Sequence, residues 1–579
     1  MNSKFIYSVL ILALISTFRL SAQMTFDGKP PVYDSLTRTY MLTVPEEVFD
    51  NGPYQMFVVI DEGVTNVSIN GQQVTDADVV EFPSISRDVK YSLTFTRDGV
   101  TTRSSIHFTF LPILTLSGSF GNDYVQGPVQ LILPESEHVQ NYQARVKWAG
   151  SSTNGTWTHK RNYHLKFVDD DGEKMEVSFF GLRSDNHWRL DAGTVDMIRF
   201  RNKAAHDLWA DFATKPYYAD KEPKARSYVR GTHIEVFLNG EYYGFYNMTE
   251  CLDRKQMKLK KYEEQEDSVI NHGFLWKAKE ATPQTLFMAN TLCDDTLDNW
   301  AGFELEYPDI EDVNPTDYSV LRNAVRFVAN SDQAAFNAHA GEYFDLPVLV
   351  DYYVFINTLF AIDNVCKNIL WGCYDSQVDK KLTIGVWDLD VTVGQHWRDL
   401  DGYYHSEAVQ PEQEMDQSPA CMLPNNLLFN YLREMPEFNM WVVNRYWQLR
   451  NGILDPANLV DRYEQIYNRL ECCGALDRET VRWSDTGDIA HRDLEFDVEF
   501  EYLSDWLRKR IAYMDANTFA CLRGDVNGDG RLNIVDLNIL IDAVLHSYTV
   551  QRMAQADVNA DNKVNIDDVV ELINVILMD

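Results

Sequence analysis

The sequence has little positive charge. Lys and Arg number 52 against 87 Asp and Glu, which gives a formal net charge of −35. Because so acidic a surface repels polyanions, the composition argues against nucleic acid and against anionic membranes as partners. After the N-terminus, no stretch approaches the roughly 18 uninterrupted apolar residues of a membrane-spanning helix. We therefore expect no membrane anchor, and a protein that meets cations.

Cysteine is also scarce, with eight residues in 579. No set of Cys and His residues has the spacing of a zinc site, and nothing indicates thiol chemistry. An even count permits disulfides outside the cytoplasm, and Cys366 and Cys373 could face each other or simply pack. We expect structural cysteines and leave their pairing open.

Residues 1–22 are typical of a secretory signal peptide. Lys4 precedes the apolar run FIYSVLILALISTF, and Leu20-Ser21-Ala22 offers a small-residue cleavage site before Gln23. No cysteine follows that site, so a lipoprotein anchor is not expected. The sequence predicts an exported protein, extracellular or associated with the cell surface, or else in the periplasm.

The remaining chain predicts a multidomain α+β protein. Residues 23–115 alternate apolar and polar positions between Asn-Gly and Asp-Gly turns, which predicts a small antiparallel β-sandwich. It would be a spacer, or would bind a surface glycan or a protein. Residues 116–519 begin with strands and become mostly helical after Asp312, which predicts two lobes. Within them we expect a helix over Asp196–Ala213 and a hairpin with a type I′ turn at Asn239-Gly240.

Two acidic clusters stand out between Ile362 and Thr392. Asp363 opens a D-x-x-x-x-N run that ends at Asn368, and Asp388 and Asp390 follow the apolar strand LTIGVW. The residues between them predict a hairpin. Phosphoryl transfer uses such groups: one Asp orients the attacking hydroxyl, and an Asn and a second Asp hold Mg²⁺. Alone the pattern is weak, because D-x-D is as often a solvated turn.

A weaker signal precedes these clusters. The small-residue turn at 150–155 leads into a predicted strand that carries Lys166. Kinase N-lobes cover and grip nucleotide phosphates with this layout, although no Gly-x-Gly-x-x-Gly is present. The alternative is that Lys166 simply points to solvent.

The strongest motif is a repeated 12-residue calcium loop near the C-terminus. Oxygen ligands are expected at positions 1, 3, 5, 7, 9 and 12, with position 7 binding through its carbonyl. The first loop supplies Asp525, Asn527, Asp529, Arg531 (carbonyl), Asn533 and Asp536, and the second supplies Asp557, Asn559, Asp561, Lys563 (carbonyl), Asn565 and Asp568. Each loop precedes an apolar helix, so residues 522–579 predict an all-α module with two Ca²⁺ ions. Position 6 is Gly530 in one loop and Asn562 in the other, and Asn tolerates the positive φ required there.

Residues from about Asp123 to Asn517 resemble the CotH (spore coat protein H) kinase-like family. The matching segments, in the family's order, are the GSST turn with Tyr163-His-Leu-Lys166, Trp188-Arg-Leu190, Asp196 with Arg201-Asn202, Leu238–Tyr246 with Glu250, Phe274–Lys277, Asp363-Asn364 with Lys367-Asn368, and Trp387–Asp390. The resemblance implies an atypical two-lobed protein kinase that transfers the ATP γ-phosphate to Ser or Thr. It also implies Mg²⁺ or Mn²⁺ bound with ATP.

Roles follow from the resemblance position by position. Asp363 would be the catalytic Asp, Asn368 would assist it or bind a metal, and Asp388 would bind the metal. Asp390 could share that metal. Lys166 resembles the phosphate-gripping Lys, with Lys160 as an alternative, and Glu250 resembles the hinge beside the adenine.

Residues 522–579 resemble a type I dockerin, which implies a cohesin-bearing partner. Val535 and Asp567 occupy matching loop positions but differ, so the two repeats should present different faces. The sequence thus predicts a kinase acting on exported proteins beside a cohesin scaffold. Two alternatives stay open: an inactive kinase-like binding module, or a carbohydrate-active subunit. The second lacks an evident Glu acid/base pair.

Overall fold

The computed structural model describes residues 24–578, except 151, 156–157, 267, 397–404, 485–492 and 548. The predicted signal peptide over residues 1–22 lies outside the described residues. The chain divides into two compact units. Residues up to 199, 230–251 and 465–496 form unit 1, and residues 200–229, 252–464 and 497–579 form unit 2.

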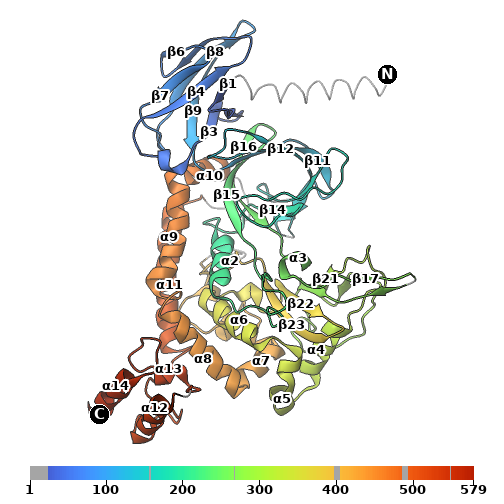
Figure 1. The fold of residues 1–579 in the computed structure, drawn as a ribbon, viewed down its shortest axis with the longest axis vertical. Helices are drawn as coiled ribbons and strands as arrows, with labels where there is room; N and C mark the ends of the chain where they lie inside the picture. Colours follow the sequence, from blue (N-terminus) through green and yellow to red (C-terminus); the bar gives the residue numbers. More distant parts are fainter. Residues whose placement is uncertain are drawn as a thin grey trace. The chain divides into compact units, whose positions relative to one another are not determined.

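Unit 1 begins with two β-sheets that share one hydrophobic core (Figure 1). The first has the order β1 (Met24–Phe26), β4 (Tyr54–Ile60), β7 (Asp78–Phe82). The second has the order β2 (Val32–Asp34), β3 (Thr39–Thr43), β9 (Val100–Thr109), β8 (Tyr91–Arg97), β5 (Val64–Ile69), β6 (Gln72–Val74). The expectation of a purely antiparallel sandwich is wrong at one pair, because β3 and β9 run parallel. Five strands separate them along the chain, so no tight turn imposes an antiparallel order.

The rest of unit 1 is organised around a closed barrel. Its order is β10 (Ile113–Leu116), β11 (Val125–Ile132), β12 (Gln140–Ala149), β13 (Asn162–Val168), β14 (His187–Asp191), β16 (Glu241–Glu250), β15 (Gly231–Leu238). The predicted hairpin at Asn239-Gly240 is confirmed, since both residues have positive φ, 54° and 81°. Alternate residues such as Leu165, Trp188 and Met248 fill the barrel. Their neighbours along each strand therefore face outward.

Unit 2 contains a five-stranded sheet and most of the helices. The sheet order is β20 (Asn299–Trp300), β21 (Phe303–Tyr307), β19 (Phe274–Ala278), β22 (Ile369–Asp375), β23 (Asp379–Val386). The helices that lie wholly in this unit before the C-terminal repeats are α2 (Arg201–Phe212), α3 (Arg254–Met257), α4 (Ser319–Asn330), α5 (Gln333–Tyr343), α6 (Leu346–Leu359), α7 (Leu427–Glu434) and α8 (Pro436–Arg450). Three more complete the described helices outside the repeats: α9 (Pro456–Cys472), α10 (Ala475–Trp483) and α11 (Phe496–Ala516). The chain therefore has a mostly β N-terminal region and a helical C-terminal region.

Helix α2 begins later than the sequence predicted. The helix expected from Asp196 starts at Arg201 instead. Asp196 accepts the backbone N–H of Ile198 in a local turn, and Arg199 has a φ of 69°. A left-handed residue cannot continue a right-handed helix, so the regular turns start beyond it.

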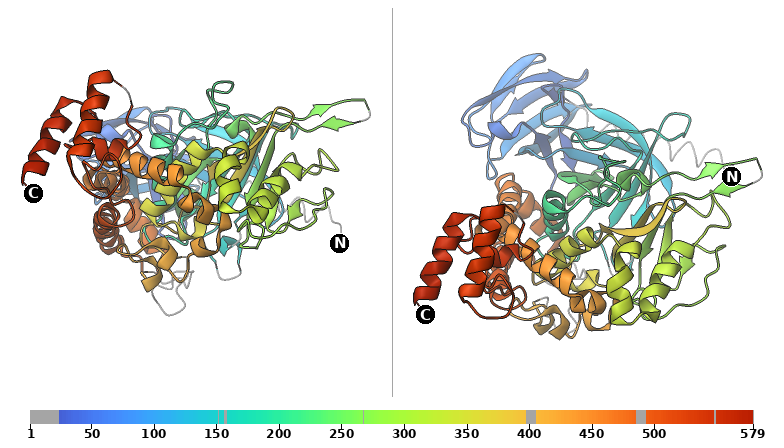
Figure 2. Two further views of the ribbon diagram at one scale, coloured as in Figure 1. Left: turned by 90° about the horizontal axis from the view of Figure 1, so that it is seen from below. Right: turned by 60° about the horizontal axis from the view of Figure 1, so that its bottom comes forward.

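The calcium-loop segment packs around its own small core. Helices α12 (Ile534–His546) and α14 (Ile566–Met578) lie side by side, with the short α13 (Met553–Ala556) between them in sequence (Figure 2). Leu540 and Leu572 are buried at their contact. Asn444 of α8 donates to Gln551 O and accepts from Ala554 N, which fastens α8 to the approach to the second loop.

All eight cysteines lie among the described residues, and all are free thiols. Cys366 and Cys373 are buried rather than bridged. Within the described part of the chain, no helix combines the length and apolar character needed to cross a membrane.

Candidate functional site

The acidic clusters of unit 2 lie at one end of the hairpin β22–β23. Ile369 pairs with Val386, so the residues just before β22 and just after β23 leave the sheet together. Asp363 sits in a 3-10 turn (Ile362–Asn364), and Asp388 follows β23. The hairpin that the sequence predicted thus forms, and it brings residues 25 positions apart in the chain to the same end of the sheet.

Asp363 is the centre of a short polar network, which we call the acidic site together with Lys367, Asn368, Asp388 and Asp390. The Asn368 amide donates to Asp363 Oδ2 at 2.8 Å, and Lys367 Nζ lies 2.8 Å from Asp363 Oδ1. Burial raises the pKa of the Asp363 carboxyl above its ordinary value, and the Asp388 carboxylate adds to the rise while Lys367 opposes it. Although burial opposes it, the charges of Asp363, Asp388 and Asp390 raise the pKa of Lys367. The charges of all three carboxylates therefore act on the same Lys367 ammonium group.

Two asparagine amides besides Asn368 hold the two segments of the acidic site. Asn364, with no exposed side-chain surface, donates to Trp387 O at 2.8 Å. Asn202 of α2 accepts the backbone N–H of Leu389 at 3.0 Å. Asn368 and Asp388 both adopt left-handed backbone, with φ of 57° and 56°. Such conformations persist only where the surroundings impose them, and they cluster at functional sites.

The donor set of the acidic site suits a hard cation. Carboxylate and amide oxygens are the ligands that Mg²⁺ and Mn²⁺ prefer. Asp388 and Asp390 keep part of their surface accessible, whereas Leu389 between them is buried. Leu389 therefore anchors the segment between two carboxylates that keep part of their surface accessible.

Unit 1 presents a cationic face on the outside of its barrel. Lys147, His164 and Arg189 are paired across β12, β13 and β14, and Lys166 is two residues along β13. The Tyr124 ring lies 4.7 Å from Lys147 Nζ and 4.8 Å from Lys166 Nζ. Burial lowers the pKa of His164 to about 2, and Arg189, His187 and the two lysines contribute. A group of cations on one sheet face is unusual in a chain whose net charge is −35. Such a face is suited to binding phosphate.

Lys160, the alternative to Lys166, has a different environment. It is fully buried, and Nζ lies 2.7 Å from Glu479 of α10 and donates to Phe245 O. Burial lowers the pKa of Lys160 to about 8. These contacts fasten α10 to the barrel, so the outward-facing Lys166 is the better candidate for a ligand contact.

The Glu250 side chain is also enclosed. It is 2% exposed, and its two oxygens accept the backbone N–H groups of Arg183 and Arg230. The carboxylate therefore fixes the end of β16. Any contact of this segment with a ligand would come from its backbone or its neighbours.

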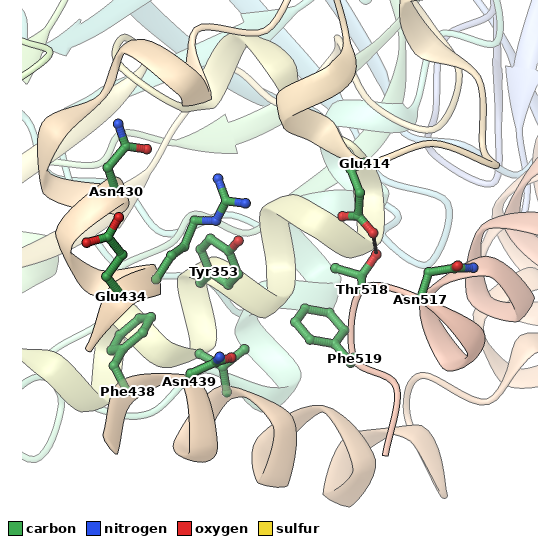
Figure 3. A pocket seen from close by; sticks show the side chains of 11 residues that line it. Tyr353, Glu414, Asn430, Glu434, Phe438, Asn439, Asn517, Thr518 and Phe519 are labelled. Atoms are coloured by element: carbon green, nitrogen blue, oxygen red, sulfur yellow. Dashed lines mark hydrogen bonds between the residues drawn. The ribbon is translucent and has the colours of Figure 1, made fainter. Parts of the chain in front are cut away.

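A large open pocket in unit 2 contains none of the candidate residues. Its volume is about 540 Å³ (Figure 3). The lining includes Tyr353, Arg433 and Phe519, and Thr518 donates to Glu414 across one side at 2.9 Å. Its carboxylates are Glu414 and Glu434, and neither belongs to the two acidic clusters that the sequence predicts for phosphoryl transfer.

The two calcium loops have nearly the same internal hydrogen bonds. Asp525 accepts the N–H groups of Gly528, Asp529 and Gly530, and Asp557 accepts those of Asp561 and Asn562. The position-12 carboxylates, Asp536 and Asp568, are fully buried. Asp536 also accepts the backbone N–H of Asn533, as the N3 residue of a capping box on α12. Asn562 has a φ of 64°, which confirms the positive φ expected at position 6.

Comparison with protein families identifies both parts of the chain. The family described as CotH kinase protein matches residues 146–514, well over half of the sequence. The chain belongs to the CotH kinase family. The family described as dockerin type I domain matches residues 523–577. No curated protein matches the chain.

Both resemblances seen in the sequence are thereby confirmed. Type I dockerin domains bind calcium and occur in extracellular proteins, and the dockerin implies a cohesin-bearing partner. The CotH domain suggests kinase-like activity. The individual site residues remain predictions.

Sequence reasoning missed several residues around the candidate groups. Lys147 and Arg189 lie opposite His164, two residues before Lys166, on the neighbouring strands, and their alternation with apolar residues was a usable signal. Lys367, four residues after Asp363, was noted only as part of the family match. The link from Asn364 to Trp387 O had no sequence signal, because 23 positions separate the two residues.

Proposed function

We propose that this chain is an exported atypical protein kinase, tethered through its calcium-loaded dockerin to a cohesin-bearing scaffold. It transfers the γ-phosphate of ATP to Ser or Thr hydroxyls of exported proteins. The observation that carries the proposal is the acidic site, where Asp363, Asn368 and Asp388 gather at one end of the hairpin β22–β23. These are the groups that phosphoryl transfer requires.

Each residue has a proposed role. Asp363 orients the acceptor hydroxyl and takes its proton, and its raised pKa makes it a better base than an exposed Asp. Asn368 holds the Asp363 carboxylate in place and offers its amide oxygen to the metal. Asp388 binds the metal, and Asp390 is available to share it. Mg²⁺ or Mn²⁺ bound with ATP supplies the positive charge that offsets the phosphates.

Lys166 is proposed to bind the nucleotide phosphates. The support is its position on the cationic face with Lys147 and Arg189, next to the Tyr124 ring. A carboxylate-rich protein needs such a face, because its overall field repels ATP. Glu250 is proposed to act indirectly. Its carboxylate fixes the end of β16, and the backbone of that segment would contact the nucleotide.

The domain arrangement is proposed with the limits predicted from the sequence. Residues 1–22 would direct export, 23–115 would act as a spacer or a binding module, 116–519 would carry the kinase-like activity, and 522–579 would dock. The last segment is the part with the most direct support, because both loops have the full oxygen set.

A second candidate is an inactive kinase-like binding module in the same assembly. One observation favours it: Lys367 lies 2.8 Å from Asp363 Oδ1 and engages the carboxylate that should act as base. Such a protein would still bind the nucleotide but would not turn it over. Transfer of phosphate therefore has to be tested separately from binding.

The decisive experiment is a thermal-unfolding titration of the mature chain, saturated with Ca²⁺, against ATP with Mg²⁺ or Mn²⁺. A binder gains about 2–3 kcal/mol at about a hundred times its dissociation constant. Asp388→Ala should lose this gain and keep the fold. The matched control is Asp505→Ala, which removes a carboxylate whose side chain is 59% exposed on α11.

The outcomes separate the candidates. A shift in the wild type that Asp388→Ala loses and Asp505→Ala keeps supports the nucleotide site. Normal Mg-ATP binding by Asp388→Ala removes the role given to Asp388, and no shift with either metal removes ATP from the proposal. Transfer of labelled γ-phosphate to a Ser/Thr-containing protein then distinguishes a kinase from the inactive module.

A further inference from the structure

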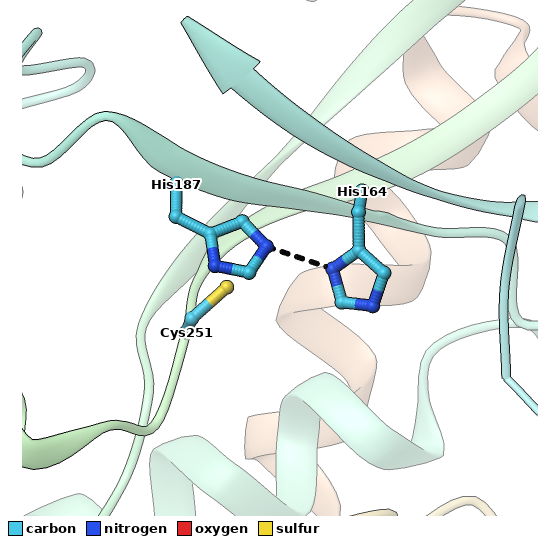
Figure 4. A group of neighbouring side chains, drawn as sticks. All are labelled: His164, His187 and Cys251. Atoms are coloured by element: carbon cyan, nitrogen blue, oxygen red, sulfur yellow. Dashed lines mark hydrogen bonds between the residues drawn. The ribbon is translucent and has the colours of Figure 1, made fainter. Parts of the chain in front are cut away.

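Three potential metal ligands meet on the outer face of the barrel in unit 1. They are His164 on β13, His187 on β14 and Cys251, the residue after β16 (Figure 4). One ligand atom from each lies within 4.8 Å of the others, and His187 Nε2 is 2.9 Å from His164 Nδ1. The rings and the thiol point toward one another in Figure 4.

The register of three neighbouring strands creates this group. Trp188 pairs with Glu250, so Cys251 follows beside His187, one residue before Trp188. Leu165 pairs with Trp188, so His164 and His187 lie diagonally across the same strand pair. Leu165 and Trp188 point into the barrel core. Their neighbours therefore share the opposite face, and residues 87 positions apart in the chain come together.

We infer that His164, His187 and Cys251 form a binding site for Zn²⁺ with three protein ligands and a fourth position open to water or a small anion. Two imidazoles and one thiolate are borderline-soft ligands, which Zn²⁺ accepts and Mg²⁺ and Ca²⁺ do not. Tetrahedral Zn²⁺ with these ligands places donor atoms about 3.3–3.6 Å apart. The nitrogens are slightly closer than this, so small ring rotations would open the group around the ion.

The three ligands differ in how much of their surface is exposed. Cys251 is buried, whereas both histidines keep partial exposure. An ion would therefore enter past the imidazoles and meet the thiol beneath.

The nearby cations set the charge balance of the site. Arg189 and Lys166 oppose a divalent ion, and the thiolate of Cys251 offsets one of its charges. A small anion in the fourth position, attracted by the same cations, would offset the second. The inference does not depend on the kinase proposal, since zinc binding is measured without ATP.

Cobalt(II) is the probe, because it adopts zinc geometry and its spectrum reports both the thiolate and the coordination number. The full mature chain, first saturated with Ca²⁺ to occupy the dockerin loops, is titrated with Co²⁺. We expect one equivalent to produce a thiolate-to-cobalt charge-transfer band and intense tetrahedral d–d bands, and Zn²⁺ to displace them. Cys251→Ser should abolish the charge-transfer band.

The matched control is Cys366→Ser, which removes a buried thiol of unit 2 and should leave the spectrum unchanged. His187→Gln changes a partly exposed side chain and keeps the thiol, so it decides the question if Cys251→Ser does not fold. It should weaken Zn²⁺ binding by more than about a hundredfold, since even residues beyond the ligand shell cost 10- to 100-fold. Absence of the thiolate band in the wild type overturns the inference, as does a band that survives both Cys251→Ser and His187→Gln.

Discussion

The acidic site and the calcium loops contain the same carboxylate and amide groups but assemble them differently. Each calcium loop collects its Asp and Asn oxygens from twelve consecutive residues, and its own backbone N–H groups hold the carboxylates. The acidic site collects its carboxylates from two segments that the pairing of Ile369 with Val386 brings together. Asn364, the residue after Asp363, and Asn202 of α2 then hold those segments.

This difference shows where each site is vulnerable. A calcium loop depends on its spacing and on the ion, because the ion offsets carboxylates that otherwise repel one another. The acidic site depends on a hairpin and on the amides of Asn364 and Asn202. Distant substitutions should therefore damage the acidic site and spare the loops, and removal of calcium should do the reverse.

The largest expected effect is chelation of calcium. With EGTA, residues 523–577 should lose hydrogen-exchange protection, while the barrel and the five-stranded sheet keep theirs. Each loop forfeits about 4 kcal/mol of stabilisation if calcium had stood at about a thousand times its dissociation constant. Loss of protection throughout the chain would contradict the independence of the two sites.

Asn364→Ala should have the next largest effect. It leaves Trp387 O without its buried donor, which costs about 1–3 kcal/mol of unfolding free energy. The shift with Mg-ATP should shrink, and calcium affinity should not change. The control Asn458→Ala removes an amide hydrogen bond to Gly452 O from an exposed position. Equal losses in the two variants would show that Asn364 has no special role.

The effects of Asp363→Asn and of Asp557→Asn on the melting temperature should each have opposite signs without and with the bound cation. Burial raises the pKa of both carboxyls in the folded protein. At a pH above that raised pKa, each ionised carboxylate therefore lowers the free energy of unfolding. Without cations, both variants should therefore have a slightly higher Tm at neutral pH. The gain should fade as pH falls through the raised pKa toward the ordinary value of 3.8.

A bound cation should reverse the order of the melting temperatures of variant and wild type. With saturating Ca²⁺, Asp557→Asn should unfold at a lower temperature than the wild type, because the ion has lost a carboxylate. Asp363→Asn should behave in the same way with Mg-ATP. Thermal scans with and without each cation measure the change in melting temperature relative to the wild type. A substitution whose effect has the same sign in both conditions is not at a cation site.

The smallest expected effect is that of Asn562→Gly. Glycine relieves the cost of a positive φ, and the variant loses the hydrogen bond from Asn451 to Asn562 Oδ1. These terms nearly cancel, so calcium affinity should change by less than about 0.5 kcal/mol. Asn562→Val is the matched contrast, because a β-branched residue at this φ is strained and should weaken the second loop clearly. Calcium titration of both variants measures the difference.

Prediction from sequence succeeded where one segment contains the whole signal. The turn at Asn239-Gly240, the hairpin β22–β23 and the loops at 525–536 and 557–568 all follow from residues close in the chain. It failed where distant segments decide. The parallel pairing of β3 with β9 has no local marker, and the start of α2 depends on the left-handed Arg199, whose guanidinium donates to the distant Glu479.

The amino-acid sequence by itself determined the two calcium-loop motifs, the hairpin and the order of family motifs, because spacing along the chain fixes local backbone geometry. Tertiary structure alone decided which cations gather on the outer barrel face and which amides hold the segments that carry Asp363 and Asp388. It also brought His164, His187 and Cys251 together, although no zinc spacing exists in the chain. Register between neighbouring strands sets such contacts, and register depends on the packing of the whole barrel.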